Sequence, residues 1–207
     1  RRPSRSRARS PAPLAAAVGQ RAGTLAGLLL QDVDEGGSGH GGLAGRARRE
    51  AVPLEAHAEV AAGARRADPL AILVKQEKTR LPELIPLRYG RMRRTRFTFL
   101  RGAAAIMASD LAAGARTDLE VELCGDAHLG NFRWYHAPTR ELVFDLNDFD
   151  ETLPGPFEWD VKRLAASITV AGRASGFTNE QAHRATRSAM RDYRKSIAET
   201  SARNPLD

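Results

Sequence analysis

Residues 124–132 read CGDAHLGNF and place a carboxylate, an imidazole and a carboxamide within 9 positions. The residues before them, DLEVEL (118–123), alternate leucine and valine with acidic side chains, a pattern typical of a half-buried β-strand. This strand delivers Asp126 at its end, and His128 and Asn131 follow in a polar loop. The sequence thus predicts a strand that ends in a loop carrying three chemically distinct side chains.

A second apolar run, LVF at 142–144, passes into an acidic turn, DLNDFDE at 145–151. It predicts a second strand whose end carries Asp145 and Asp148. A pair of strands is a rigid support that can hold a polar loop and an acidic turn in fixed positions. We therefore expect the two strand ends to contribute to one site.

The rest of the segment 67–207 predicts mainly helices. Asp-Pro at 68–69 is a helix start, and TNEQ at 178–181 has the spacing of a capping box. FTF at 97–99 alternates and predicts a short strand, whereas Pro-Gly-Pro at 154–156 predicts a turn. Helices that flank a few strands, without a regular βαβ repeat, indicate the α+β class.

Residues 1–66 consist mainly of Arg, Ala, Gly, Ser and Pro and show no sustained periodicity. This composition predicts a low-complexity, disordered basic extension. The extension holds 11 of the 32 basic residues and 6 of the 25 acidic ones, so it carries +5 of the total charge of +7. The segment 67–207 is almost balanced at +2, which weighs against a nucleic-acid partner.

The single cysteine, Cys124, excludes an intramolecular disulfide and a zinc site built from several cysteines. This usage fits a reducing compartment, and we expect the protein to be cytoplasmic. No apolar run approaches the roughly 20 residues that a transmembrane helix needs, so we expect no membrane partner.

Phosphoryl transfer to a hydroxyl requires a carboxylate near the nucleophile and hard oxygen ligands for Mg²⁺. Asp126 and Asn131 have the Asp-x-x-x-x-Asn spacing of a kinase catalytic loop, and Asp148 follows 17 residues after Asn131 at a strand end. The combination is much more specific than either part, because an isolated Asp-x-x-x-x-Asn is common by chance. It favours a Mg²⁺-dependent phosphotransferase.

These motifs resemble those of known families. GDAHLGNF followed by VFDLNDFDE is similar to the GDxHxxN and IDFDD pair of aminoglycoside and choline kinases. Over about residues 67–200, through PLRYGRM, FLRGAAAIMASDLA and PGPFEWDVKRLAAS, the chain more closely resembles the bacterial family named domain of unknown function 2252 (DUF2252). The kinase resemblance implies a protein-kinase-like fold, with ATP and Mg²⁺ as cofactors and a hydroxyl-bearing molecule as acceptor.

The resemblance also implies roles for individual residues. Asp126 takes the place of the catalytic base, and His128 joins it in the catalytic loop, where it braces the backbone. Asn131 and Asp148 take the places of the metal ligands, and Asp145 is the rival of Asp148 for that role. We prefer Asp148 because DFDE matches DFDD.

Three more residues are implied by position. Asp160 is expected to support the loop as a hydrogen-bond acceptor from the following helix. Arg88 and Arg101 are the expected phosphate-binding residues for the nucleotide, since guanidinium groups bind phosphate in a bidentate manner. An ordinary charged surface remains the alternative explanation for both arginines.

The nucleotide-binding half of a kinase is missing from the pattern. Residues 67–125 contain neither a convincing Gly-rich nucleotide loop nor a strand lysine. Members of the resembled family continue into a Gly-rich segment and a lysine, which implies a circularly permuted kinase-like arrangement. We therefore expect this chain to be the N-terminal part of such a domain, a fragment that is inactive alone.

Two other functions stay open. GDAH also gives the Asp-x-His of two-metal phosphatases, so a metallophosphoesterase that uses Asp126 and His128 is one alternative. The later histidines, His136 and His183, lack the setting that this class requires. The other alternative is a non-catalytic nucleic-acid-binding module, with phosphate contacts from the arginine row at 184–194.

Overall fold

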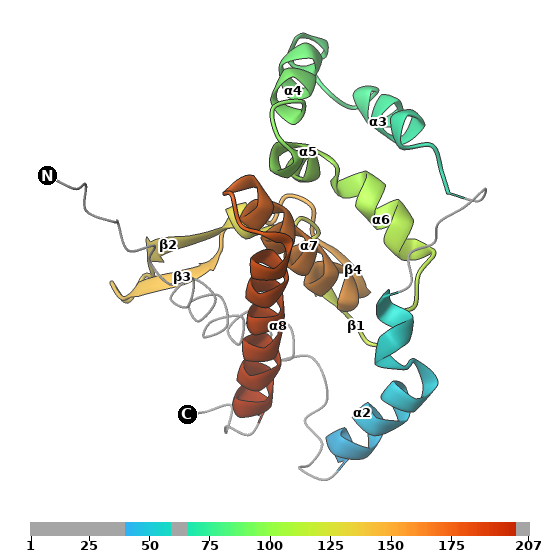
Figure 1. Cartoon of the computed structure of the whole chain (residues 1–207), viewed down its shortest axis with the longest axis vertical. Helices are drawn as coiled ribbons and strands as arrows, with labels where there is room; N and C mark the ends of the chain where they lie inside the picture. The colour runs from blue at the N-terminus through green and yellow to red at the C-terminus, as the bar shows by residue number, and fades with distance from the viewer. Residues whose placement is uncertain (1–39, 59–65, 202–207) are drawn as a thin grey trace, which may run out of the picture.

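The computed structural model describes residues 40–58 and 66–201 (Figure 1). The elements, in chain order and with η for 3₁₀ helices, are α2 (His40–Ala51), η1 (Leu54–Ala58), α3 (Pro69–Glu77), η2 (Pro82–Leu84), α4 (Ile85–Met92), α5 (Arg96–Gly102), α6 (Ala104–Ala112), β1 (Glu120–Leu123), η3 (Leu129–Asn131), β2 (Phe132–His136), β3 (Leu142–Leu146), β4 (Leu153–Pro156), α7 (Glu158–Ala174) and α8 (Asn179–Ser201). The α+β class predicted from the sequence is confirmed.

The basic extension expected at 1–66 is described only in part, since residues 1–39 and 59–65 lie outside the described residues. Residues 40–51 form helix α2, where the composition had predicted irregular chain. Its second half, RARREA (46–51), consists of Arg, Ala and Glu, which are strong helix formers that a low-complexity composition conceals. Arg48 Nε donates to Asp118 Oδ1 at 2.6 Å and so links α2 to the start of the first sheet.

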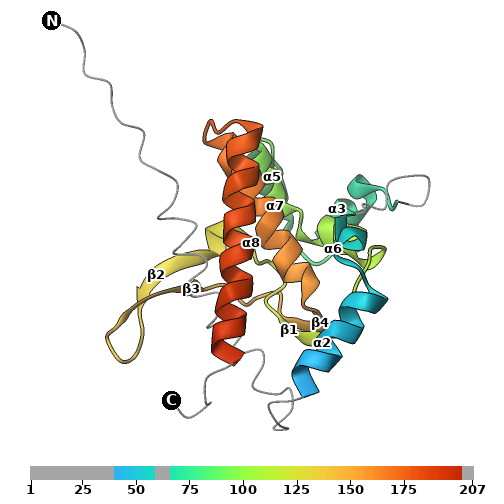
Figure 2. The same cartoon turned by 60° about the horizontal axis from the view of Figure 1, so that its bottom comes forward.

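The four strands form two separate antiparallel sheets, β1 with β4 and β2 with β3. The strands expected at 118–123 and 142–144 are present as β1 and β3, but they do not pair with each other. Residues 132–136, which follow the polar loop, form β2 and fold back on β3 through a turn in which Arg140 has a φ of 67°. Figures 1 and 2 show this hairpin projecting from the helices. A hairpin needs only a short turn, and its formation leaves β1 to pair with the strand after the acidic turn.

The Pro-Gly-Pro segment at 154–156 lies in β4 and is not a turn. Proline cannot donate to a strand ladder, and it is tolerated here because β4 is an edge strand of a sheet of two. The register pairs Leu123 with Leu153. The chain therefore returns from the acidic turn alongside β1, and this return places Glu151 against Gly125.

Helices α3 to α6 pack around a small apolar cluster (Figure 1). Its buried members are Leu73, Met92, Ala103 and Ile106. The predicted helix start at 68–69 is confirmed, since Asp68 Oδ1 accepts a hydrogen bond from Leu70 N at 3.0 Å.

The strand predicted at 97–99 is wrong, because these residues lie in helix α5. Thr95 Oγ1 accepts from Thr98 N at 3.0 Å, and Thr98 Oγ1 accepts from Thr95 N at 2.9 Å. This is a capping box built from two threonines, and it fixes the first turn of a helix. The alternation of Phe97 and Phe99 therefore reflects two sides of a helix, one toward His128 and one toward solvent.

Helices α7 and α8 pack on each other and on β3 around Phe144, Leu164, Ile168 and Ala189 (Figure 2). The predicted capping box at 178–181 is confirmed by hydrogen bonds in both directions between Thr178 and Gln181. Within residues 40–58 and 66–201, no helix combines the length and the apolar character needed to cross a membrane.

Gly125 is the point at which the end of β1 meets the acidic turn. Its φ is +81°, and a Cβ at this position would overlap the backbone carbonyl of Glu151. Both the backbone conformation and the close approach therefore require glycine. This contact holds the loop after β1 and the segment before β4 together.

We predict that Gly125→Ala lowers the free energy of unfolding by at least about 2 kcal/mol, because it adds both backbone strain and overlap. Urea unfolding followed by circular dichroism measures the change. Gly176→Ala separates the two causes, since Gly176 also has a positive φ, +84°, but no atom within 4 Å of an added Cβ. Its cost should be about 1 kcal/mol.

Gly90→Ala is the control without strain or overlap, since Gly90 lies in helix α4 with nothing within 4 Å of an added Cβ. This change should stabilise the protein by about 0.5 to 1 kcal/mol. Equal losses at positions 125 and 176 would contradict the close contact with Glu151.

Candidate functional site

Asp126 lies at the end of β1, and an arginine of helix α7 holds its carboxylate. Arg163 Nε donates to Asp126 Oδ1 at 2.5 Å, and Arg163 Nη2 donates to the Leu100 carbonyl of α5 at 3.0 Å. The Arg163 side chain is only 3% exposed, against 18% for Asp126. The pair is therefore shielded from water, and it ties α5, α7 and the loop after β1 together.

Arg163 is a residue of the candidate site that the sequence analysis does not single out. A signal is present in the sequence, because Asp160, Arg163 and Ser167 recur at i, i+3 and i+7 and so lie on the same side of the helix as the apolar Leu164 and Ile168. Such a row of polar residues on the buried side of a helix requires partners. Each of the three side chains has a partner in residues 124–129.

His128 is buried at 2% exposure and braces the loop. Its Nδ1 accepts a hydrogen bond from Gly130 N at 3.0 Å, so the proton of the neutral ring lies on Nε2. Nε2 is 3.6 Å from Asp126 Oδ2 and 3.3 Å from Arg101 Nε. Arginine can only donate, and Nε2 already carries the ring proton, so Nε2 cannot accept a hydrogen bond from Arg101. The Nε2–H group is instead placed to donate to the Asp126 carboxylate. Burial lowers the pKa of His128, with the neighbouring arginines adding to the effect against the charge of Asp126.

Asn131 is buried at the end of η3, 4% exposed, and faces back toward the same loop. Its Nδ2 donates to the backbone carbonyl of Asp126 at 3.0 Å, and its own backbone N–H donates to the His128 carbonyl at 2.9 Å. The side-chain nitrogen of Asn131 is thus used within the loop. Its Oδ1 atom makes no hydrogen bond with a described residue.

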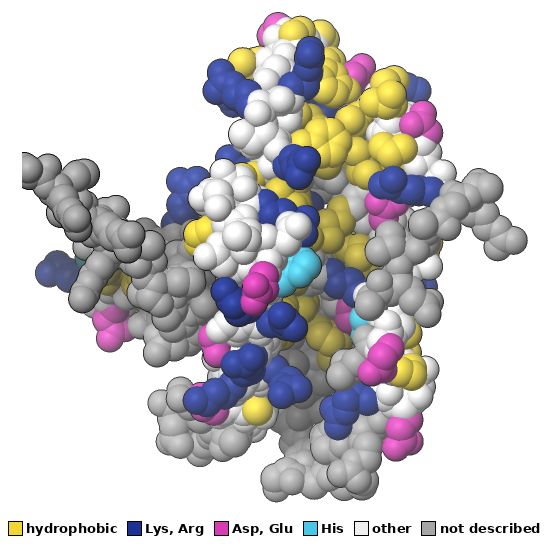
Figure 3. Space-filling model, viewed as in Figure 1, with side chains coloured by type: hydrophobic (Ala, Val, Ile, Leu, Met, Phe, Trp, Pro, Cys, Tyr) yellow, Lys and Arg dark blue, Asp and Glu magenta, His cyan; other side chains and the backbone are white. Residues whose placement is uncertain are grey.

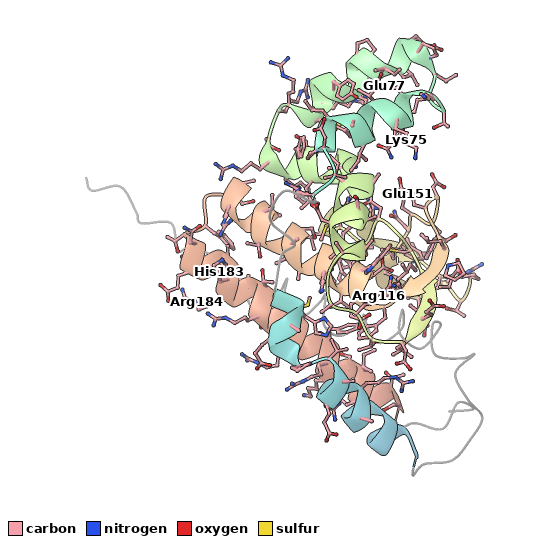
Figure 4. All side chains as sticks on the ribbon, turned by 90° about the vertical axis from the view of Figure 1, so that its right-hand side faces the viewer. Lys75, Glu77, Arg116, Glu151, His183 and Arg184 are labelled. Carbon is pink, nitrogen blue, oxygen red and sulfur yellow. The ribbon has the colours of Figure 1, made fainter. Side chains whose placement is uncertain are left out.

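Asp148 lies beyond β3, in the turn that returns to β1. Its Oδ1 accepts from Asp150 N at 3.5 Å. Partial burial raises the pKa of Glu151, and the charges of Asp126 and Asp148 add to this effect. Glu151 therefore lies within electrostatic reach of both Asp126 and Asp148. In Figure 4, Glu151 lies between α3, which carries Lys75 and Glu77, and the strands of the first sheet.

Asp145 lies inside β3, directly opposite Arg133 of β2. Strand alternation places it on the face opposite the buried Phe144 and Leu146, and its Oδ1 accepts from Leu146 N at 2.7 Å. Asp148 is beyond the strand, in the same turn as Glu151. Asp145 thus lies within the β2–β3 hairpin, whereas Asp148 lies outside it, in the turn that contains Glu151.

Asp160 holds the backbone at the end of β1. Its two carboxylate oxygens accept from Cys124 N at 2.8 Å and from Gly125 N at 3.2 Å. Burial raises its pKa, against the effect of these hydrogen bonds. The carboxylate thus makes the contacts that a supporting acceptor requires.

The two expected phosphate ligands lie in different surroundings. Arg88 Nη2 donates to the Gly102 carbonyl at 2.6 Å and to Gln76 Oε1 at 3.1 Å, so this side chain joins α4 to α3 and α5. Burial lowers the pKa of Arg88. Arg101 is exposed and approaches His128. Of the two, Arg101 lies at the loop.

A pocket of about 160 Å³ opens beside the Asp126–Arg163 pair. Its lining includes Gly125, Glu151, Asp160 and Arg163 together with residues of α6. Within the described ranges, no three His, Cys, Asp or Glu side chains converge as a metal centre would require. The hard oxygens of Asn131 and Asp148 nevertheless suit Mg²⁺, which keeps several of its waters when bound to proteins.

The fold and the site define an α+β protein with a strand-end carboxylate locked by a buried arginine. A family model described as "Uncharacterized protein conserved in bacteria (DUF2252)" matches residues 80–207, and the chain belongs to this family. Comparison with the curated proteins and with the solved structures gave no match.

We predict that Arg163→Met lowers the free energy of unfolding by about 3 kcal/mol, because it leaves the Asp126 carboxylate enclosed without its partner. The double variant Asp126→Asn with Arg163→Met should lose clearly less than the sum of the single changes. Urea unfolding of the four proteins gives the coupling.

Arg184→Met is the matched control, since Arg184 pairs with Glu180 at 2.7 Å on an exposed surface of α8, away from Glu151 in Figure 4. Its effect should stay within about 0.5 kcal/mol. Additive losses at Asp126 and Arg163 would contradict the coupling described above.

We predict that His128 makes the protein less stable in acid. Its folded-state pKa lies below the ordinary 6.5, so the unfolded chain takes up the proton first, and stability falls as the pH drops below 6.5. His128→Asn keeps an acceptor for Gly130 N without the titration. The stability difference between wild type and this variant should therefore shift against the wild type between pH 7 and pH 5, by at most about 1.4 kcal/mol per pH unit. Parallel curves would contradict it.

Proposed function

We propose that this site serves Mg²⁺-dependent phosphoryl transfer from ATP to a hydroxyl-bearing acceptor, in a kinase-like arrangement that is circularly permuted. The single observation that carries the proposal is the hydrogen bond between Asn131 Nδ2 and the Asp126 carbonyl. It connects the Asn131 carboxamide to the backbone of Asp126, so that the two ends of the Asp-x-x-x-x-Asn motif are joined directly.

In this proposal Asp126 Oδ2 receives the acceptor hydroxyl, because Oδ1 is occupied by Arg163. Asn131 Oδ1 and the Asp148 carboxylate would hold Mg²⁺, which would neutralise charge on the phosphate oxygens. Arg101, which is exposed beside His128, would contact phosphate through its guanidinium group. The acceptor would enter the pocket that Arg163 lines.

The geometry weighs against the metallophosphoesterase alternative. In that class the histidine of Asp-x-His binds metal through a ring nitrogen. Here His128 Nδ1 is used by Gly130 N, and the ring is buried between Phe97 and Asp126. The imidazole is thus a structural support, which agrees with the phosphotransferase reading.

We predict that Mn²⁺, used as a paramagnetic substitute for Mg²⁺, broadens the amide signals of Asn131 and Asp148 in the NMR spectrum of this chain. In Asp148→Asn, the same broadening should require at least about tenfold more Mn²⁺. Removal of a residue that only supports a metal ligand already lowers metal affinity by this factor. Because the metal is titrated alone, the result does not depend on a nucleotide clamp.

Asp150→Asn is the matched control, since it removes the same charge from an exposed position two residues away. It should leave the broadening unchanged. If Mn²⁺ broadens no signal at Asn131, or if both variants lose the effect equally, the metal site and the phosphotransferase built on it are wrong.

A further inference from the structure

Helices α4 and α5 and the turn between them carry an unusual charge. Residues 85–102 contain six arginines and no acidic residue. The helices on either side differ, since α3 contains Glu77 and α6 contains Asp110. The positive charge of the 85–102 segment is therefore not balanced within the segment.

Four of these arginines are exposed and unpaired. Arg91, Arg93, Arg94 and Arg96, here called the arginine loop, make no side-chain hydrogen bond or ion pair with any described residue. Arg48 and Arg66, by contrast, pair with Asp118 and Asp110. Figure 3 shows Lys and Arg side chains around the end of the molecule formed by α4 and α5. The arginine loop is thus free to bind an anionic partner.

An aromatic side chain lies beside these arginines. Phe99 is 46% exposed, and it follows Arg96 by three positions on α5, so the two share one face of the helix. A flat ring next to unpaired guanidinium groups is the combination that binds single-stranded nucleic acid, because a base stacks on the ring while phosphates meet the arginines. A duplex does not offer its base faces to such a ring.

We propose that the arginine loop and Phe99 form a binding site for single-stranded nucleic acid. This partner goes beyond the proposed phosphotransferase and does not depend on it. The site continues toward the candidate active site only through Arg101, which approaches His128 at 3.3 Å. The rival partner is an anionic lipid surface, because Leu84 and Leu87, each 50% exposed, precede the arginines. The aromatic ring on the α5 side favours nucleic acid.

The test is fluorescence anisotropy of a labelled oligouridine of about 16 nucleotides, a length typical of single-strand sites, titrated with the 207-residue chain. Each phosphate neutralised on a single strand contributes about −0.7 to the slope of log affinity against log salt. Four arginine contacts therefore predict a slope of about −3, or about 50-fold weaker binding at 200 mM than at 50 mM salt.

The triple variant Arg93→Gln, Arg94→Gln, Arg96→Gln should make the slope shallower by about 2, since three phosphate contacts are lost. Its matched control is Arg187→Gln, Arg191→Gln, Arg194→Gln, which removes the same charge from exposed positions of α8 and should keep the slope. Phe99→Ala should weaken binding at least about fivefold, and Phe99→Trp should restore it, because stacking needs only an aromatic face. Circular dichroism verifies that each variant is folded.

Three results would overturn the proposal. The first is no binding at about 50 mM salt, where phosphate contacts are strong. The second is an equal loss in both triple variants, which would show attraction by net charge alone. The third is binding to phosphatidylserine vesicles, but not to the oligonucleotide, that is lost in Leu84→Ser with Leu87→Ser.

Discussion

The structure depends on the buried contact between Arg163 and Asp126. Helix α7 offers three polar side chains on one face, and each fixes a different part of the loop after β1. Asp160 accepts from Cys124 N and Gly125 N, Arg163 binds the Asp126 carboxylate, and the buried Ser167 Oγ accepts from Leu129 N at 2.8 Å. The loop is therefore held in place by side chains of α7, although it contains only one short 3₁₀ turn of its own.

The same arrangement leaves two carboxyl groups of the site in partly desolvated surroundings. Glu151 and Asp160 have pKa values raised mainly by burial, and Arg163 opposes the shift in both. A raised carboxyl pKa means that the surroundings do not fully stabilise the ionised form. A cation bound near Glu151, such as the proposed Mg²⁺, would stabilise that form.

Local signals in the sequence predicted local structure well. The helix starts at 68–69 and 178–181 and the strands β1 and β3 follow from capping residues and alternation, which act over a few residues. The pairing of the strands could not be predicted from these local signals, because it depends on which strands a short turn can join. β2 and β3 are joined by such a turn and pair with each other, so β1 pairs with β4. The strand predicted at 97–99 is wrong because a helix begins there with a Thr–Thr capping box, which is harder to detect in a sequence than the usual Thr–Glu pattern. Arg163 was missed because a basic residue on a helix is ordinarily exposed.

Helix α5 lies between the candidate site and the arginine loop. On its inner side the Leu100 carbonyl accepts from Arg163, and Arg101 approaches His128. On its outer side Arg96 and Phe99 face solvent. Within seven residues, helix α5 therefore carries both the backbone contact to Arg163 and two side chains of the proposed nucleic-acid site.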